Sequence, residues 1–198
     1  MKNNLERVVV IGTSCAGKTA FARALARLLS YPHIELDALH WLPNWTERPT
    51  DEFRALTAET LAQNCWVVDG NYAVVRDLMC SQATTVIWLN YSFPIVIRRA
   101  LTRTFRRALT REELFSGNRE SLRMAFFSRD SILWWVFTTF HRRRRNYRSL
   151  FDTKPSSHLV YVEFRNPTEA ETFLTSLARR ARSDITAKRQ SLAPEPQL

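Results

Sequence analysis

The sequence has few cysteines and no long apolar run, and both shortages limit what the protein can be. Its three cysteines form no CxxC pair, so the composition indicates neither a disulfide framework nor a zinc site and is typical of a reducing cytoplasm. The longest apolar stretch, residues 132–140, is far below the roughly 20 residues that a membrane span needs. The first residues lack the apolar core of a signal peptide. We therefore expect a cytoplasmic protein with no membrane span.

Acidic residues and lysine are also scarce. The chain has 29 basic residues against 19 acidic ones, a net charge of +10, and only four of the basic residues are lysine. This excess favours anionic partners, and the planar guanidinium of arginine suits bidentate contacts with phosphate oxygens. Nucleotides, phosphorylated metabolites, nucleic acid and an acidic membrane surface all fit this charge, and so does a solvated basic face.

Short runs of β-branched and aromatic residues predict five strands, and helical patterns separate them. Strands that alternate with helices are typical of a parallel sheet with helices on both faces, an α/β fold of three layers. The 198 residues are enough for one such domain and too few for two. The predicted strands are residues 7–11, 34–36, 65–68, 85–89 and 159–164.

We expect one domain over residues 1–182 and a disordered tail over residues 183–198. The tail mixes charged residues, serine, alanine and two prolines and has no apolar period. Between the fourth and fifth predicted strands, residues 93–149 are mostly helical in pattern and hold more than half of the arginines. We interpret this insertion as an arginine-rich lid.

Two of the only four glycines lie in residues 12–19, which match G-x-x-x-x-G-K-[ST] at every fixed position. A strand pattern precedes the motif and a helical pattern follows it, as a phosphate-binding loop requires. Gly12 and Gly17 let the backbone wrap around phosphate oxygens, Lys18 reaches the β- and γ-phosphates, and the Thr19 hydroxyl ligates Mg²⁺. The candidate nucleotide-binding residues are Gly12, Thr13, Ser14, Cys15, Ala16, Gly17, Lys18 and Thr19.

A second acidic element has the form of a Walker B segment. Residues 66–69 are an apolar strand that ends in the carboxylate of Asp69, which would hold Mg²⁺ or its water. We therefore predict Thr19 and Asp69 as the metal residues. The alternative for Asp69 is a turn or a helix cap.

Other motifs decide between the classes of P-loop protein. A GTPase would carry an [NT]KxD segment that reads guanine, and residues 153–155, Thr-Lys-Pro, lack the aspartate. A transport ATPase would carry an LSGGQ-like segment, which is absent from the sequence. A kinase is therefore the favoured class, with ATP as the nucleotide and GTP as an alternative.

Four segments resemble the bacterial adenylate-kinase-like proteins that are often labelled DNA topology modulation proteins. They are residues 17–26, 33–41, 66–72 and 86–91. The resemblance covers about residues 7–180. It implies a P-loop fold of the nucleoside- or nucleotide-kinase type, with five parallel strands and an arginine-bearing lid. The resembling kinases place the adenine at the turn before the last helix, which implies Arg165 in the turn 165–167.

The acceptor is expected at the end of the second predicted strand, because open α/β sheets bind ligands at the carboxyl edge. Asp37 lies there, and in similar small-molecule kinases a carboxylate at this place contacts the acceptor hydroxyl or acts as its base, so Asp37 is our first candidate for the general base, ahead of His40. A cap or turn residue is the alternative for Asp37. His40 and Trp41 follow closely and would line an acceptor pocket, although packing roles fit them equally well. Arg76 corresponds loosely to the phosphate-holding arginine of the Asp-Gly-Phe-Pro-Arg turn in adenylate kinases, with residues 71–72 departing from that turn. A surface salt bridge is its alternative.

The helix predicted from about residue 94 has two distinct faces. The arginine face holds Arg99, Arg103, Arg106 and Arg107. The apolar face holds Ile97, Leu101, Phe105 and Leu109. The arginines resemble the lid arginines of nucleotide kinases, which neutralise charge on the transferred phosphoryl group, so Arg103 and Arg107 are catalytic candidates. A solvated helix face is the alternative.

Residues 132–145 join a strongly apolar helix to a run of four arginines. This segment fits a core helix or homodimer interface that ends in cations, a nucleic-acid surface, or a helix on a membrane surface. The first option is the most economical, because Leu133, Val136, Phe137 and Phe140 share a face.

The predicted function is Mg²⁺-dependent transfer of the γ-phosphoryl group of ATP to a nucleoside, a nucleotide or another small molecule. The alternative from another class is a nucleic-acid-binding NTPase in which the nucleotide switches a basic surface. A protein that binds nucleotide without turnover is the third option.

Overall fold

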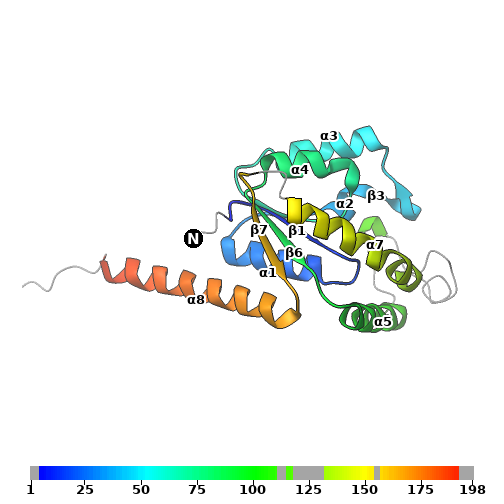
Figure 1. Ribbon diagram of the computed structural model, residues 1–198. Coiled ribbons are helices and arrows are strands. Elements are labelled where there is room, and N and C mark those ends of the chain that lie inside the picture. Colours follow the sequence, from blue (N-terminus) through cyan, green and yellow to red (C-terminus); the bar gives the residue numbers. More distant parts are fainter. Residues whose placement is uncertain (1–4, 111–114, 118–131, 154–156, 192–198) are drawn as a thin grey trace, which may run out of the picture.

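The computed structural model describes residues 5–110, 115–117, 132–153 and 157–191 (Figure 1). Within these ranges, no helix is long and apolar enough to cross a membrane.

Five parallel strands form the central sheet, in the order β2-β5-β1-β6-β7. They are β1 (Arg7–Gly12), β2 (His33–Glu35), β5 (Trp66–Asp69), β6 (Thr85–Leu89) and β7 (Val160–Phe164). The predicted parallel five-stranded sheet is confirmed. Chain order reverses across β1, so the loop after β1 lies where open α/β sheets bind ligands.

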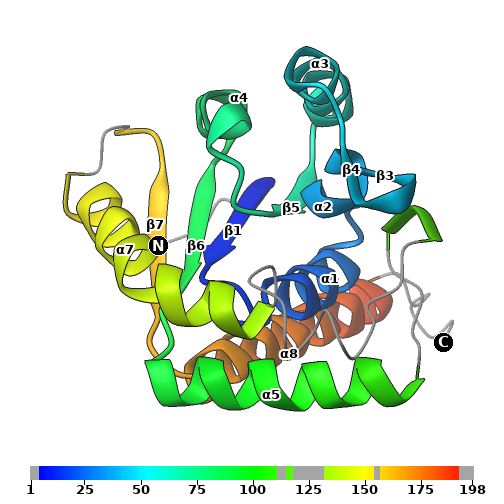
Figure 2. The ribbon, with the colours of Figure 1, turned by 90° about the vertical axis from the view of Figure 1, so that its right-hand side faces the viewer.

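Helices cover both faces of the sheet (Figures 1 and 2). One side has α1 (Lys18–Leu29), α8 (Pro167–Ser191) and α5 (Phe93–Thr110). The other side has α3 (Thr50–Leu61), α4 (Arg76–Gln82) and part of α7 (Ile132–Thr153). The short elements between β2 and α3 are α2 (Leu36–His40), β3 (Trp41–Leu42), a 3-10 turn (Pro43–Trp45) and β4 (Thr46–Glu47). Two more 3-10 turns are Ala73–Val75 and Phe115–Gly117.

Alternate residues of the central strands point to opposite faces of the sheet and pack into two separate parts of the core. Val8 and Val10 of β1 pack with α1, whereas Val9 packs with α3 and α4 on the opposite face. Because both faces are covered, β1 reads as an unbroken apolar run rather than as an alternating one. This is why the central strands were visible in the sequence.

α7 corrects the interpretation of residues 132–145. Val136 and Phe140 are buried, as a core helix requires, but the side chain of Phe137 is 63% exposed, even though its ring and that of Phe140 both contact Phe93. The arginine run lies inside the helix, because α7 continues to Thr153. Its cations are therefore not placed at the helix C-terminus. The side chain of Leu133 lies outside the described part.

α5 corrects the predicted apolar face at two positions, whereas Ile97 packs against the core as predicted and the side chain of Leu109 lies outside the described part. Leu101 and Phe105 are exposed, and the buried positions are Val96, Ala100 and Thr104. These three recur every fourth residue, so they form one narrow stripe along the helix. The side chains of these three residues are buried against the rest of the protein. The larger apolar side chains of Leu101 and Phe105 are exposed.

α8 also differs from the prediction, because it continues to Ser191 and the predicted disordered tail begins inside it. The segment 183–191 contains no proline and several good helix formers, so the helix meets no breaker before Pro194. Residues 192–198 lie outside the described part.

Candidate active site

The loop Gly12–Thr19 connects β1 to the start of α1 and is tightly packed at both glycines. A Cβ on Gly12 would lie 2.9 Å from the carbonyl oxygen of Leu89, and one on Gly17 would lie 2.9 Å from the guanidinium of Arg99. Gly17 also has φ +94°, which favours glycine. The backbone of Leu89 therefore explains the glycine at position 12, and the positive φ explains the glycine at position 17, where the tip of the Arg99 side chain could move away.

Lys18 is folded back over this loop. Its Nζ donates to the carbonyl oxygen of Thr13 at 3.2 Å. Burial lowers the pKa of the Lys18 ammonium, while the carboxylates of Asp37 and Asp69 act to raise it and Arg143 acts to lower it. A phosphate group in the loop would offer this ammonium a stronger acceptor than a carbonyl oxygen.

Thr19 and Asp69, the two predicted metal residues, are in direct contact. The Thr19 hydroxyl donates to Oδ2 of Asp69 at 2.7 Å, and His33 Nε2 lies 2.9 Å from Oδ1. Glu35 belongs to the same cluster, where burial and then Asp69 raise its pKa. His33 and Glu35 were not predicted as site residues, because their contact with Asp69 depends on the pairing of β2 with β5.

This arrangement fits Mg²⁺ bound together with a nucleotide. A threonine hydroxyl that donates to a carboxylate keeps its lone pairs for a cation. Among the described residues, no group of three or more His, Cys, Asp or Glu side chains could hold a metal ion. Mg²⁺ commonly binds through one or two protein ligands, with phosphate oxygens and water completing its shell. Thr19 and Asp69 would suffice for that role.

Asp37 lies in the first turn of α2, immediately after β2. The hydroxyl of Tyr72 donates to Oδ1 of Asp37 at 2.6 Å. Burial raises the pKa of Tyr72, and the Asp37 charge raises it further, so Tyr72 stays protonated as a donor. Tyr72 was not predicted, because it is 35 residues away in the chain.

His40 and Trp41 lie beside Asp37 in an aromatic cluster. The His40 ring is 4.4 Å from the ring of Tyr72, 5.0 Å from that of Phe53 and 4.9 Å from that of Trp41. Its Nδ1 is buried and has no hydrogen-bond partner among the described residues. His40 therefore packs in this structure, and its role at an acceptor remains a prediction.

Arg76 begins α4 and lines a small cavity of about 20 Å³ together with Asn71, Tyr72 and Tyr147. Burial raises the pKa of Tyr147, whereas the nearby guanidinium groups of Arg143 and Arg76 act to lower it. Two arginines from different helices therefore approach the same tyrosine hydroxyl.

Arg143 also lies close enough to Lys18 to affect the lysine pKa. Arg143 is therefore the member of the four-arginine run of α7 whose charge acts on Lys18. No predicted site residue lies on this helix. The four consecutive arginines at 142–145 were the available sequence signal for a site residue on this helix. A run of arginines does not indicate which member lies closest to the site.

Arginines of α5 lie against the other side of the phosphate loop. Arg99 donates to the carbonyl oxygen of Ala16 at 2.6 Å, and its guanidinium lies 5.1 Å from the ring centre of Tyr91. Arg103 Nη1 is 4.0 Å from Sγ of Cys15. The side chain of Arg107 lies outside the described part, so its catalytic role stays a prediction.

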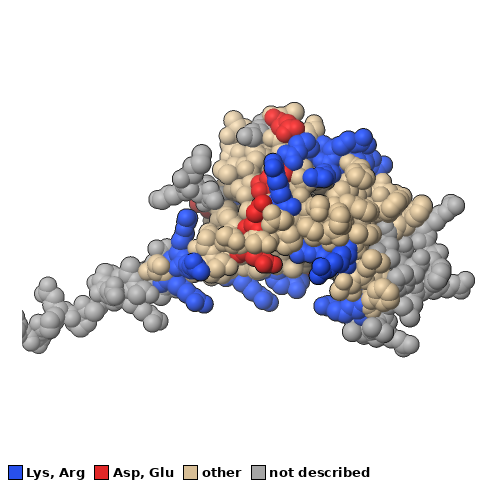
Figure 3. Space-filling view, turned by 60° about the horizontal axis from the view of Figure 1, so that its bottom comes forward, with Lys and Arg blue, Asp and Glu red and all other residues tan. Residues whose placement is uncertain are grey.

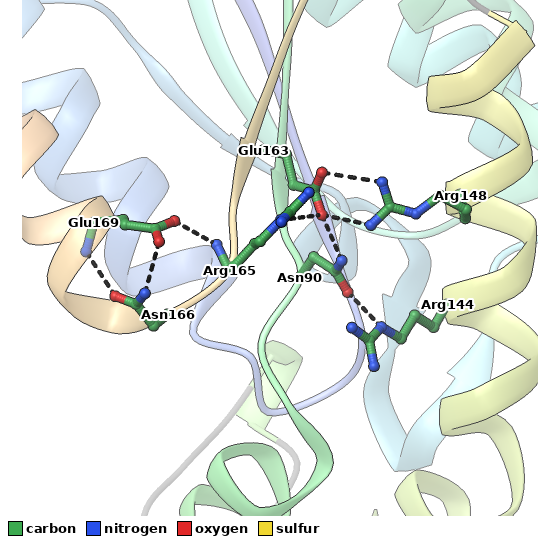
Figure 4. Close-up of polar contacts among 7 residues, drawn as sticks. All are labelled: Asn90, Arg144, Arg148, Glu163, Arg165, Asn166 and Glu169. Carbon is green, nitrogen blue, oxygen red and sulfur yellow. Dashed lines mark hydrogen bonds and ion pairs between the residues drawn. The ribbon is translucent and has the colours of Figure 1, made fainter.

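The turn predicted to hold adenine is occupied by a helix cap (Figure 4). Asn166 accepts from the backbone N–H of Glu169 at 3.0 Å, and the Glu169 carboxylate accepts from the backbone N–H of Arg165 at 2.7 Å. The Arg165 side chain points to Glu163, with Nε 3.5 Å from its carboxylate. An open groove of about 820 Å³ lies beside the turn and α8. The adenine assignment remains a prediction.

Several solved kinases have similar structures. A shikimate kinase from Bacteroides thetaiotaomicron has a TM-score of 0.53 at 14% identity, over 89% of this chain and 98% of that chain. A shikimate kinase from Acinetobacter baumannii, in complex with shikimate, has a TM-score of 0.50 at 16% identity, over 92% and 96%. A gluconokinase from Sinorhizobium meliloti has a TM-score of 0.48 at 19% identity, over 96% and 97%. No protein-family model matches the sequence, and no curated protein matches it significantly.

The chain therefore has the three-layer α/β fold of small P-loop kinases, with a parallel five-stranded sheet. At identities of 14 and 16%, the fold is the property that this chain shares with the two shikimate kinases. The adenylate-kinase-like part of the predicted resemblance agrees with this fold. The DNA topology modulation label stays a prediction.

Proposed function

We propose that this protein is a P-loop kinase that transfers the γ-phosphoryl group of ATP to a nucleoside, nucleotide or other small-molecule acceptor. The observation that carries the proposal is the contact between the loop and a strand-end carboxylate: the hydroxyl of Thr19, which follows Lys18, donates to Asp69 at 2.7 Å. The loop thus contacts a carboxylate suited to Mg²⁺, and Asp37, a carboxylate suited to an acceptor hydroxyl, follows β2, the strand that pairs with β5. This convergence supports phosphoryl transfer more strongly than nucleotide binding alone.

On the nucleotide side, the loop 12–19 and Lys18 would hold the triphosphate, and Thr19 and Asp69 would hold Mg²⁺. The bound ion would supply charge neutralisation on the β- and γ-phosphates. The contacts of both metal residues support this role, because the Thr19 hydroxyl and the Asp69 carboxylate already lie 2.7 Å apart. GTP remains the alternative nucleotide.

On the acceptor side, Asp37 would accept the proton of the attacking hydroxyl. The acceptor oxygen forms the new bond to the γ-phosphorus while the bond to the β–γ bridging oxygen breaks, and the nucleoside diphosphate leaves. Tyr72 engages one oxygen of Asp37 and leaves the other for the acceptor. The neighbouring rings of His40 and Trp41 would form the wall of the acceptor site.

Arginines from two helices would neutralise charge on the transferring group. Arg103 approaches the phosphate loop from α5, and Arg143 approaches Lys18 from α7. Arg107 follows Arg103 on α5 and is proposed for the same role. Cations placed where negative charge develops stabilise the transition state and need no reorganisation during the reaction.

The surface gives less support to a nucleic-acid-binding NTPase. Figure 3 shows basic side chains in separate groups on one face, with acidic side chains between them. The arginine-rich part of α7 is also partly engaged inside the protein, because Arg144 donates to Asn90 and Arg148 donates to Glu163. These arginines are held by protein acceptors rather than presented to a phosphate backbone.

The proposal is tested by incubating the protein with Mg²⁺ and γ-labelled ATP against a panel of nucleosides, nucleotides, sugars and hydroxy acids. We expect transfer to one class of acceptor, and Lys18→Ala should lower it by on the order of 10³-fold. Hydrolysis with no transfer to any acceptor would contradict the kinase assignment. DNA binding that weakens steeply with salt would then favour the nucleic-acid alternative. ATP binding without any chemistry would reduce the function to nucleotide binding.

A further inference from the structure

His33, the first residue of β2, places a polar ring on the nucleotide side of the sheet. β2 pairs with β5 in a register that sets His33 opposite Val67 and Glu35 opposite Asp69. Side chains two residues apart in a strand share a face. The imidazole therefore lies on the same face as Asp69 and reaches it along the strand direction. Its side chain is only 15% exposed, and that of Asp69 is 3% exposed.

The two oxygens of Asp69 have different partners. His33 Nε2 lies 2.9 Å from Oδ1, and the Thr19 hydroxyl donates to Oδ2 at 2.7 Å. Since an ionised carboxylate can only accept, the His33 contact requires a proton on Nε2. The imidazole thus holds one oxygen while the other stays on the side of Thr19. Without His33, the Asp69 side chain would be oriented only by its contact with Thr19, and Thr19 is itself a predicted metal ligand.

We propose that His33 is a positioning residue for Mg²⁺ binding, which fixes the rotamer of Asp69 and keeps Oδ2 beside Thr19. This inference rests on the proposed function, in which Thr19 and Asp69 hold the metal of the bound nucleotide. Residues that hydrogen-bond to a metal ligand orient it, and losing one typically lowers metal affinity or activity by roughly 10- to 100-fold.

A purely structural role for His33 explains the observations less well. Backbone pairing already joins β2 to β5 over three residue pairs. The next residue of β2, Ile34, is apolar and packs into the core on the opposite face. A largely buried imidazole needs a polar partner, and the partner of His33 is the candidate metal carboxylate, Asp69, rather than a loop carbonyl or a surface group.

The test is ATP binding measured by calorimetry across a series of Mg²⁺ concentrations and in EDTA. His33→Leu keeps the bulk of the side chain and removes the donor. We expect the Mg²⁺ concentration for half-maximal enhancement of ATP binding to rise by roughly 10- to 100-fold, with metal-free binding unchanged. His33→Gln restores a nitrogen donor at similar reach and should stay close to wild type.

His158→Ala is the matched control, because His158 is exposed and lies before β7. Unfolding temperatures of the nucleotide-free variants show whether His33→Leu is folded, and the glutamine variant carries the comparison if it is not. The inference is overturned if His33→Leu keeps the wild-type Mg²⁺ dependence, if it weakens metal-free binding equally, or if His33→Gln fails to rescue. A wild-type protein that binds no ATP with Mg²⁺ would instead overturn the proposed function itself.

Discussion

The carboxylates at the carboxyl edge of the sheet differ between its two halves. At the β2–β5 half, Asp37 and Asp69 are held by hydroxyl and imidazole groups. At the β6–β7 half, Glu163 receives two hydrogen bonds from Arg148, at 2.6 and 3.1 Å, and one from Asn90. A carboxylate held by hydroxyl groups keeps its charge available to a metal or an acceptor. A carboxylate that is paired with arginine, such as Glu163, has its charge neutralised and stabilises the packing of the helix that carries the arginine.

The Glu163 network ties α7 to the ends of two strands (Figure 4). Arg144 donates to Asn90 at 2.8 Å, and Asn90 donates to Glu163 at 2.6 Å. Burial acts to raise the pKa of Glu163, but the hydrogen bonds from Arg148 and Asn90 outweigh it and lower the pKa. The same helix carries Arg143, whose charge acts to lower the pKa of Lys18. The network of the β6–β7 half therefore helps to position a helix that acts on the candidate site.

The largest difference between the halves is expected from Asp37→Asn. It should lower the turnover number by roughly 10²- to 10⁴-fold because the general base is lost, while ATP binding is retained. Glu163→Gln is the same chemical change on the other half and should leave turnover nearly unchanged. Steady-state kinetics with the acceptor found in the panel measure both variants. Equal turnover losses in the two variants would remove the distinction between the halves.

Arg143→Ala should have the next largest effect. Loss of a cation beside the transferring phosphoryl group is expected to lower the turnover number by roughly 10²-fold, with a smaller change in ATP affinity. Arg142→Ala is the matched control, since Arg142 precedes it in α7 and is exposed. The two variants are compared in the same transfer assay. If Arg142→Ala is the more damaging change, Arg143 does not act at the site.

Tyr72→Phe should have a moderate effect on transfer. A hydrogen bond to a charged acceptor contributes about 1.5 kcal/mol, so its loss is expected to lower the turnover number about tenfold. Tyr31→Phe is a suitable control, because the Tyr31 hydroxyl lies beside Cys65. Kinetics at saturating ATP separate an effect on turnover from one on acceptor affinity. Unchanged kinetics in Tyr72→Phe would show that Asp37 needs no orientation by this hydroxyl.

The smallest expected effect is on stability. Glu163→Gln should lower the free energy of unfolding at neutral pH by about 1 kcal/mol, because Arg148 is partly exposed and water screens the pair. The pKa of Glu163 is lowered in the folded protein, so its contribution is complete above the ordinary pKa of 4.5 and is lost as pH falls toward the folded value. Urea unfolding from pH 7 downward should show the two proteins converge. A difference that stays constant would contradict this assignment.

Much of the fold could be predicted because its signals are local. The five strands are short, mostly apolar runs, and the helical apolar pattern after the phosphate loop includes Phe21 and Leu25, which are buried in α1. The faces of α5 were harder to predict. Its buried stripe includes Ala100 and Thr104, which are small or polar, so hydrophobicity alone selects Leu101 and Phe105, which are exposed. The end of α8 was missed because a helix-forming segment without an apolar stripe was interpreted as disordered.

The candidate site divides in the same way. The phosphate loop could be identified from eight consecutive residues, because its backbone geometry and its lysine are local properties. Asp37 and Asp69 could be predicted from their places after apolar strands. Their partners could not, since His33 and Tyr72 lie 36 and 35 residues from the carboxylates that they contact.

Sequence alone therefore determined the parallel sheet and the acidic residues at two strand ends, and it predicts the phosphate-binding loop. It could not decide which carboxylates are paired with arginine among the described residues, or which arginine of the run 142–145 acts on the pKa of Lys18. Those properties depend on strand order and on the rotation of α7, both of which arise when distant segments pack together. The chemistry assigned to each carboxylate follows from that packing, because its partners determine whether its charge remains available.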